Sequence, residues 1–315
     1  LRALRGKRSQ IAFQRRLGAR SNLAAAWEAG RRSPTAAKTF WVAGRMGIEP
    51  RVALSRFLAS PESAADVIDP SEPEGIARLL EALRGRTSLT DVARRTGRSR
   101  FAVARWLKGE AEPRLPDFFR LVEATSLRLL DFVAAFVPPQ SLPSIAQAWR
   151  ELEVARRSAY DLPWSHAVLR AVELDEYRRL ERHVPGFIAE LLGIGRDEEE
   201  ECLEALRRSG QIRLEDGRYE PRVLAVDTRR DPARDQALKS WWSGVAKERL
   251  DHNAEGQFSY NLFTVSEADY QRLRELQRAY FRELRTIVAE SEPAERVVLA
   301  NVQLVPLTSA PSRVS

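Results

Sequence analysis

SQIAFQRRLGARSNLAAAWEAGRRSP, residues 9–34, decides the fold of the first part of the chain, and SLTDVARRTGRSRFAVARWLKGEAEP, residues 88–113, repeats it. The repeat extends over residues 1–60 and 80–139 at a constant offset of 79, without a gap. Identical residues align at Arg15/Arg94, Arg16/Arg95, Gly18/Gly97, Trp27/Trp106, Gly30/Gly109 and Pro34/Pro113. Self-similarity at a fixed period predicts two copies of one small helical domain.

The spacing within each copy predicts two helices that meet at a tight corner. Ser9 is a residue type that caps a helix start, and Gly18 is one that permits the left-handed conformation at a helix end. A second helix is expected over about residues 20–28, with Trp27 on its inner, core-facing side. Residues 88–109 repeat this order. The corner has three or four residues, the length found in helix-turn-helix motifs.

These residues resemble the Cro/CI-like, or XRE-type, helix-turn-helix transcription regulators. The family pattern is a small hydroxyl residue, Gln and an apolar residue, then Gly at the corner, then a recognition helix that ends in apolar-Glu-x-Gly-x-x-x-Pro. Copy one (residues 1–60) fits this pattern, whereas copy two (residues 76–137) has Leu89 in place of the Gln and Leu107 in place of the Glu. The resemblance implies two tandem five-helix domains that bind DNA.

By position, the resemblance places base-contacting side chains at the start of each recognition helix and phosphate contacts around it. Asn pairs with adenine and Arg with guanine, and Gln10 is expected to contact a phosphate. The expected DNA-binding residues are Gln10, Arg20, Ser21, Asn22, Ala25, Arg31 and Arg32 in copy one, and Arg98, Ser99, Arg100, Phe101, Arg105 and Lys108 in copy two. Arg15, Arg16, Arg94 and Arg95 fit either phosphate contacts or the dipole of their own helix.

The net charge of +7 is unevenly distributed along the chain. Residues 1–60 hold 13 Lys and Arg against 2 Asp and Glu, and residues 76–137 hold 12 against 7. Residues 61–75 hold five acids and no base, and residues 138–315 hold 26 bases against 30 acids. A basic front and an acidic back indicate a polyanion-binding module joined to a module of another kind.

Linkers are expected after each copy. Residues 61–75 form an acidic linker between the two copies, and residues 138–143 form a Pro-rich linker between copy two and a winged-helix-like module. Residues 144–222 predict helices followed by helix, turn, helix and a two-stranded hairpin with Asp216-Gly217 at its turn, which is the order of a winged helix. Its second helix begins with five acids, residues 197–201, which would repel phosphates, so we expect an interaction or scaffolding element. Arg213 and Arg218 leave an accessory phosphate contact open.

Residues 223–308 are expected to form a small α/β unit. Alternating apolar residues predict strands at 257–266 and 296–307, and a helix capped by Ser266 between them. So long a connection predicts parallel strands, which need cover from helices or from another subunit. With FSYNLFTVS at 258–266 and RVVLANVQLVPLT at 296–308, this back half resembles the C-terminal domain of unknown function of a group of bacterial XRE-type regulators. The expected fold class is mainly α, with this small α/β unit at the end.

The residue types of catalytic and metal sites are scarce. His166, His183 and His252 lie out of helical reach of one another and of Cys202, which we expect to be buried. No Gly-rich phosphate loop, nucleophile elbow or paired-cysteine motif occurs. We therefore expect no catalytic residue, metal or cofactor, and no enzyme activity. One cysteine and no long apolar stretch favour a cytoplasmic protein without a membrane segment.

Three functional hypotheses follow from these patterns. The first is a homodimeric, sequence-specific transcription regulator that binds double-stranded DNA through its N-terminal copies, with a C-terminal half that dimerises or senses a signal. The second is a protein-interaction adaptor whose helix-turn-helix copies are partly degenerate and whose acidic winged helix binds a protein partner. The third adds a small-molecule effector that binds around Trp241-Trp242.

Overall fold

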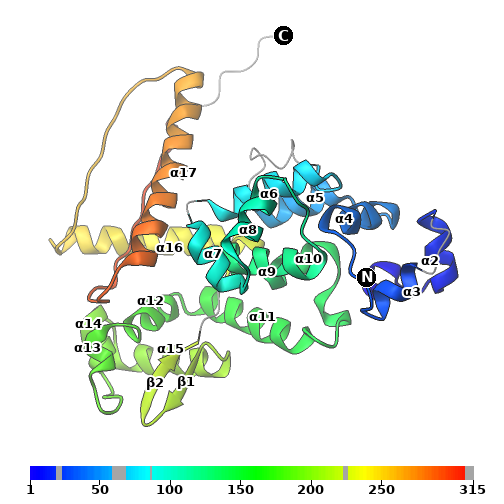
Figure 1. Cartoon of the computed structure of the whole chain (residues 1–315). Helices are drawn as coiled ribbons and strands as arrows, with labels where there is room; N and C mark the ends of the chain where they lie inside the picture. The colour runs from blue at the N-terminus through cyan, green and yellow to red at the C-terminus, as the bar shows by residue number, and fades with distance from the viewer. Residues whose placement is uncertain (19–22, 59–68, 86, 223–225, 309–315) are drawn as a thin grey trace. The chain divides into compact units, whose positions relative to one another are not determined.

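The computed structural model describes residues 1–18, 23–58, 69–85, 87–222 and 226–308 of the 315-residue chain (Figure 1). The chain is mainly helical, which confirms the predicted fold class. It divides into two compact units, which are treated separately below. Unit 1 comprises residues 1–157, 209–211 and 222–230, and unit 2 comprises residues 158–208, 212–221 and 231–315.

Unit 1 holds both sequence copies, each as five helices. Copy one forms α1 (Arg2–Arg5), α2 (Gln10–Arg16), α3 (Leu23–Glu28), α4 (Ala36–Arg45) and α5 (Pro50–Leu58). Copy two forms α6 (Pro73–Arg84), α7 (Leu89–Thr96), α8 (Arg100–Leu107), α9 (Leu115–Ser126) and α10 (Leu129–Phe136). The starts of α2 and α7, of α4 and α9, and of α5 and α10 are each 79 residues apart, which is the offset of the sequence repeat.

The two copies share part of their hydrophobic core. A small cluster belongs to copy one alone and contains Phe13, Leu17, Ala24, Trp27, Val42 and Met46. A larger cluster joins α4 and α5 to the helices of copy two. Phe40 of α4 lies 5.6 Å from Phe118 and 5.3 Å from Phe136, measured between ring centroids, in edge-to-face geometry. Because aromatic pairs of this kind bury large apolar areas, the copies pack as one body.

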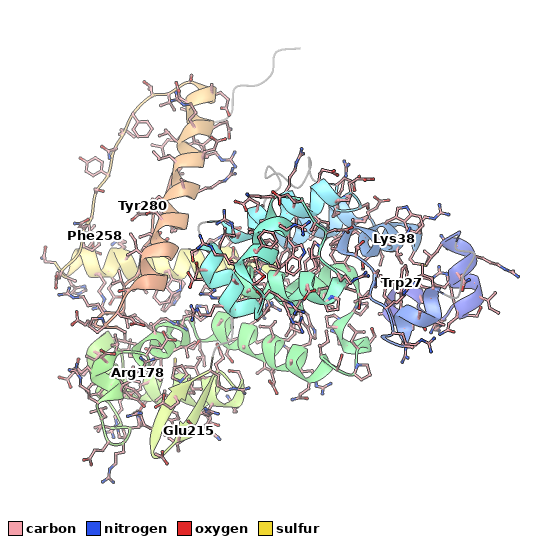
Figure 2. The ribbon with its side chains drawn as sticks, in the orientation of Figure 1. Trp27, Lys38, Arg178, Glu215, Phe258 and Tyr280 are labelled. Atoms are coloured by element: carbon pink, nitrogen blue, oxygen red, sulfur yellow. The ribbon has the colours of Figure 1, made fainter. Side chains whose placement is uncertain are left out.

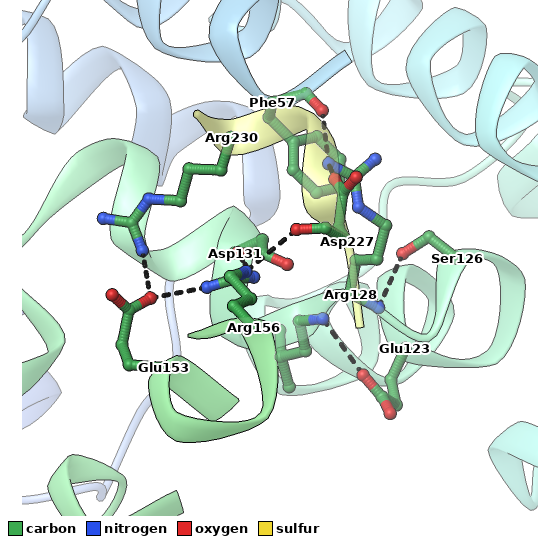
Figure 3. A network of polar contacts seen from close by, with 10 residues as sticks. Phe57, Glu123, Ser126, Arg128, Asp131, Glu153, Arg156, Asp227 and Arg230 are labelled. Atoms are coloured by element: carbon green, nitrogen blue, oxygen red, sulfur yellow. Dashed lines mark hydrogen bonds and ion pairs between the residues drawn. The ribbon is translucent and has the colours of Figure 1, made fainter. Parts of the chain in front are cut away.

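The rest of unit 1 contains η2 (Pro139–Ser141), the first part of α11 (Ala146–Asp161) and η3 (Thr228–Arg230). Buried charged side chains form a network in this part of the unit (Figure 3). Arg156 of α11 is ion-paired with Asp131 of α10, donates from Nη1 to Glu153 at 2.6 Å, and donates from Nε to the Asp227 carbonyl at 2.9 Å. Burial of Asp131 raises the pKa of its carboxyl group, against the attraction of Arg156.

Unit 2 contains the predicted winged-helix order. Its elements are α12 (Trp164–Ala171), α13 (Asp175–Arg178), α14 (Phe187–Leu192), α15 (Arg196–Arg208), β1 (Ile212–Glu215), β2 (Arg218–Pro221), α16 (Pro232–Asp251) and α17 (Glu267–Glu290), with the end of α11. The strands β1 and β2 pair antiparallel, with Ile212 opposite Pro221 and Glu215 opposite Arg218. Asp216 and Gly217 have φ of 50° and 81°, the left-handed pair that a two-residue hairpin turn requires.

The strands expected at residues 257–266 and 296–307 are not formed, although the helix between them is. Ser266 caps α17 by accepting from the Asp269 amide at 3.1 Å, as predicted. Both flanking segments are coil, and β1 and β2 form the only sheet within the described residues (Figure 1). A strand requires a hydrogen-bonded neighbour, and neither segment pairs with another strand within the part of the chain described here. The predicted strands at these residues, and the parallel pairing expected of them, are therefore wrong.

Candidate nucleic-acid interface

The corner of each copy is built by the same residues at equivalent positions. The side-chain oxygens of Ser9 and Ser88 each accept from a backbone amide three residues on, at 3.1 Å, and so start α2 and α7. Gly18 and Gly97 have φ of 61° and 63°, which confirms that the corner needs the left-handed conformation. Each corner leads to the second helix, α3 or α8.

The second helix of copy one begins beside residues that lie outside the described part of the chain. Arg20, Ser21 and Asn22 are among these residues, so their predicted base contacts stay predictions. Ala25 is half-buried on α3, and Trp27 on the same helix is buried, as its helical position predicted (Figure 2). The inner face of α3 is therefore core.

Arg31 and Arg32 form the exposed basic pair that follows α3. Both side chains are exposed, and neither has an ion-pair partner among the residues that the structure describes. Their backbone amides donate to the Ala26 carbonyl at 3.0 and 3.3 Å, which holds this segment against the end of α3. The equivalent residues of copy two are Glu110 and Ala111, so the positive charge at this position belongs to copy one alone.

Gln10 has a partner within the chain. Its Nε2 donates to Glu28 at 2.8 Å, and Arg5 Nε donates to the same carboxylate at 2.6 Å. Although burial opposes it, the hydrogen bonds from Arg5 and Gln10 lower the pKa of Glu28. Leu89 and Leu107 replace Gln10 and Glu28 in copy two, and both pack against the larger core cluster. A polar pair in one copy is thus an apolar pair in the other.

Arg16 and Arg95 have the same structural role in the two copies. Arg16 Nε donates to the Arg45 carbonyl at 2.6 Å, and Arg95 Nη1 donates to the Ala124 carbonyl at 3.1 Å. Both pairs of positions differ by the repeat offset of 79. These arginines therefore join the first helix of each corner, α2 or α7, to the last turn of α4 or α9. Arg15 is exposed on α2, and Arg94 is ion-paired with Asp91 at 3.0 Å.

Most predicted contacts of copy two already have partners within the chain. Arg98 pairs with Asp117 at 2.6 Å, and Ser99 caps α8 by accepting from the Ala102 amide at 3.2 Å. Arg105 and Lys108 both lie 4.0 Å from Glu110. Two residues at the start of α8 stand out instead: Arg100 is exposed with no ion pair among the described residues, and the Phe101 side chain is 73% exposed.

In the predicted winged-helix module of unit 2, one acid of α15 and the arginines of the hairpin have partners within the unit. Glu199, in the acidic start of α15, is buried and accepts from the Ala189 amide at 2.9 Å, so it holds α14 against α15. On the hairpin, Arg213 pairs with Glu215 at 2.7 Å and Arg218 with Glu220 at 2.6 Å. The basic charge of the hairpin is thus balanced by its own glutamates.

Within the described residues, no group of His, Cys, Asp and Glu side chains is arranged to hold a metal ion. No helix in the described ranges has both the length and the apolar character to cross a membrane. Cys202 is buried, as predicted, and burial raises the pKa of its thiol to about 12. The rings of Trp241 and Trp242 pack against Trp164 at 5.4 and 5.6 Å between centroids.

Comparison with known families gives one match, over residues 144–307, to the family described as Domain of unknown function (DUF4423). The match spans slightly more than half of the chain. The chain belongs to this family. The DUF4423 region begins just before α11 and includes the winged helix, α16, α17 and the two extended segments. No curated protein and no solved structure matches the chain.

Sequence reasoning missed the contacts that join residues far apart in the chain. The roles of Arg16 and Arg95 depend on carbonyl groups 29 residues away, and the Gln10–Glu28 bond spans 18 residues. One signal was available for the second case. Gln10 and Glu28 are both replaced by leucine in copy two, and paired replacement indicates contact.

Proposed function

We propose that this DUF4423 protein is a sequence-specific, DNA-binding transcription regulator that reads the major groove through its N-terminal helix-turn-helix corners. The observation that carries the proposal is the pair Arg31 and Arg32, exposed and without acidic partners in the described chain, directly after the second helix of a corner. Motifs of this geometry insert the second helix into the groove and hold phosphates with basic residues around it.

The resemblance to XRE-type regulators assigns base recognition to residues 20–22, which precede α3 and lie outside the described residues, and to Ala25 of α3. Arg20 and Asn22 have the side chains that pair with guanine and adenine. Ser21 belongs to the same predicted set. The contacts of Gln10 and Glu28 give Gln10 a second role, since its amide orients the corner whether or not it also contacts a phosphate.

A homodimer is the assembly that we propose for the C-terminal half. Large apolar side chains stand exposed on the two extended segments and on α17, among them Phe258 and Tyr280 (Figure 2). Tyr260 is 91% exposed and Leu262 is 79% exposed. Exposed apolar patches mark interaction surfaces, and unpaired extended backbone is a template for strand addition. The same segments of a second copy supply both the apolar cover and the missing strand partners. Signal sensing, by a protein or a small molecule, is assigned to this half as well.

Duplex binding by the full-length chain tests the proposal. Sites selected from random duplexes are labelled, and affinity is measured at several salt concentrations. Removal of two phosphate contacts by Arg31→Ala with Arg32→Ala makes the negative slope of log K against log salt shallower by about 1.8. Arg150→Ala with Arg157→Ala, which removes two exposed arginines from α11, is the matched control and leaves the slope unchanged. A wild-type slope near zero contradicts the proposal.

A protein-interaction adaptor is the second candidate, and a specific observation favours it for copy two. Arg98, Arg105 and Lys108 lie next to acids of their own copy, which reduces the charge available to a phosphate. If the adaptor function is the correct one, the wild-type chain binds no duplex, whereas the acidic surface of α15 binds a basic peptide in a salt-dependent way.

A further inference from the structure

The two copies meet in a reciprocal backbone contact, here named the intercopy joint (residues 33–37 and 112–116). The Ala36 amide donates to the Pro113 carbonyl at 3.0 Å, and the Leu115 amide donates to the Pro34 carbonyl at 2.9 Å. Because each residue is 79 positions from its counterpart, each bond is the other with the copies exchanged. Thr35 and Arg114, also equivalent, form an antiparallel bridge between these bonds. Such exchange is the mark of a two-fold interface.

Side chains around the joint also form hydrogen bonds between the two copies. Glu112 of copy two accepts from the Ala37 amide at 2.7 Å, which satisfies a free donor in the first turn of α4. The equivalent of Ala37 is Pro116, which has no amide proton and needs no acceptor. Arg114 donates to the Ser33 carbonyl at 2.6 Å. In both contacts, a side chain of copy two binds a backbone group of copy one.

The fifth helices of the copies also pack against each other. Phe57 of α5 and Phe132 of α10 lie 5.3 Å apart between ring centroids, edge to face, within the shared core. Arg128, from the segment before α10, donates to the Phe57 carbonyl at 2.9 Å. Backbone hydrogen bonds at the joint and aromatic packing beside it hold the two copies in a fixed position relative to each other.

The two corners so related are unequal in chemistry. Copy one presents Arg31 and Arg32 after its second helix, whereas copy two has Glu110 and Ala111 there. Copy two presents Arg100 and the exposed ring of Phe101 at the start of α8, where copy one has Ser21 and Asn22. Arg31 and Arg32 suit the corner of copy one to phosphates, and Phe101 suits the corner of copy two to apolar base edges such as the thymine methyl group.

We infer that the two copies form an intrachain pseudodimer that binds one duplex at two unequal half-sites, so that a single chain supplies both reading corners. The inference rests on the proposed function and specifies its DNA target: two half-sites of different sequence, centred one helical turn or a multiple apart, as for two-fold pairs of corners in general. Copy one dominates the salt dependence, and copy two contributes selectivity through Arg100 and Phe101.

Footprinting of the full-length chain on a selected duplex tests the inference. Wild type is compared with a copy-one variant, Arg31→Ala with Arg32→Ala, and a copy-two variant, Arg100→Ala with Phe101→Ala. Arg120→Ala, exposed on α9, is the control for a charge change in copy two. We expect two protected patches for wild type and the control. Each variant loses one patch, a different one, and the copy-two variant binds about tenfold or more weakly.

The outcomes separate the inference from the function on which it rests. A copy-two variant with wild-type affinity and both patches overturns the inference, because two chains then bind through copy one, but it leaves the proposed function standing. A single wild-type patch also overturns it. If wild type binds no duplex, the proposed function fails, and the inference with it. The substituted side chains are exposed, and circular dichroism checks that each variant is folded.

Discussion

Loss of Arg156 is expected to lower the free energy of unfolding of unit 1, because it leaves a buried charge without its partner. Asp131 and Arg156 are both buried, and Asp131 Oδ2 has no hydrogen-bond partner among the described residues, so its carboxylate depends on Arg156 (Figure 3). Arg156→Leu leaves this carboxylate without its ion-pair partner, with only the weaker attraction of Arg128, and removal of one partner of a buried pair costs about 3–5 kcal/mol. The double variant, Arg156→Leu with Asp131→Asn, buries a neutral amide and loses only about 1–3 kcal/mol.

Urea unfolding followed by circular dichroism measures these free energies. Arg157→Leu, an exposed neighbour on α11, is the control and changes stability little. Burial already raises the pKa of Asp131 above its usual 3.8 in the folded state, so its contribution to stability is largest below pH 3.8 and is lost as pH rises through the raised value. Without Arg156 this pKa rises further, and the deficit of Arg156→Leu relative to wild type shrinks as pH falls. A single variant less than about 1 kcal/mol below wild type, or a double variant as unstable as the single, refutes the reasoning.

Three further outcomes are expected. Gln10→Leu and Glu28→Leu each destabilise unit 1, but the double variant is less unstable than the sum, because it recreates the leucine pair of copy two; a double-mutant cycle in urea that shows additivity contradicts the contact. Burial lowers the pKa of His183 below 6.5, so its contribution to stability is complete above pH 6.5 and is lost as pH falls through the lowered pKa. His183→Asn flattens this pH dependence of the melting temperature, and an unchanged pH dependence contradicts the prediction. Cys202 is inert to a thiol reagent at pH 8 and reacts on unfolding, because burial raises its pKa to about 12; rapid labelling of the folded chain excludes this environment.

Local signals in the sequence predicted the elements of the corners well. Ser9, Gly18 and their equivalents act through backbone groups within three or four residues, so their effect is visible in a short window. The repeat then transferred each assignment to copy two. The hairpin at Asp216-Gly217 was predictable for the same reason, since two residues define its turn.

Sequence patterns did not predict contacts between residues far apart in the chain. The pairing of Arg98 with Asp117 and of Arg156 with Asp131 depends on how helices pack, which no local period encodes. Residues 257–266 have the alternation of a strand, yet alternation specifies which side chains share a face and says nothing of whether a neighbouring strand exists. Both failures arise where tertiary contacts decide the outcome.

The intercopy joint has a consequence for how binding depends on the amount of protein. Two separate chains must meet before they can occupy two half-sites, so their occupancy at low concentration follows the square of the concentration. Two corners held in one chain face each other at an effective concentration fixed by the fold, in the millimolar range or above for short connections. Occupancy of a two-part site by the two corners of one chain does not require the homodimer proposed for the C-terminal half, so it follows the first power of the chain concentration and begins without a threshold.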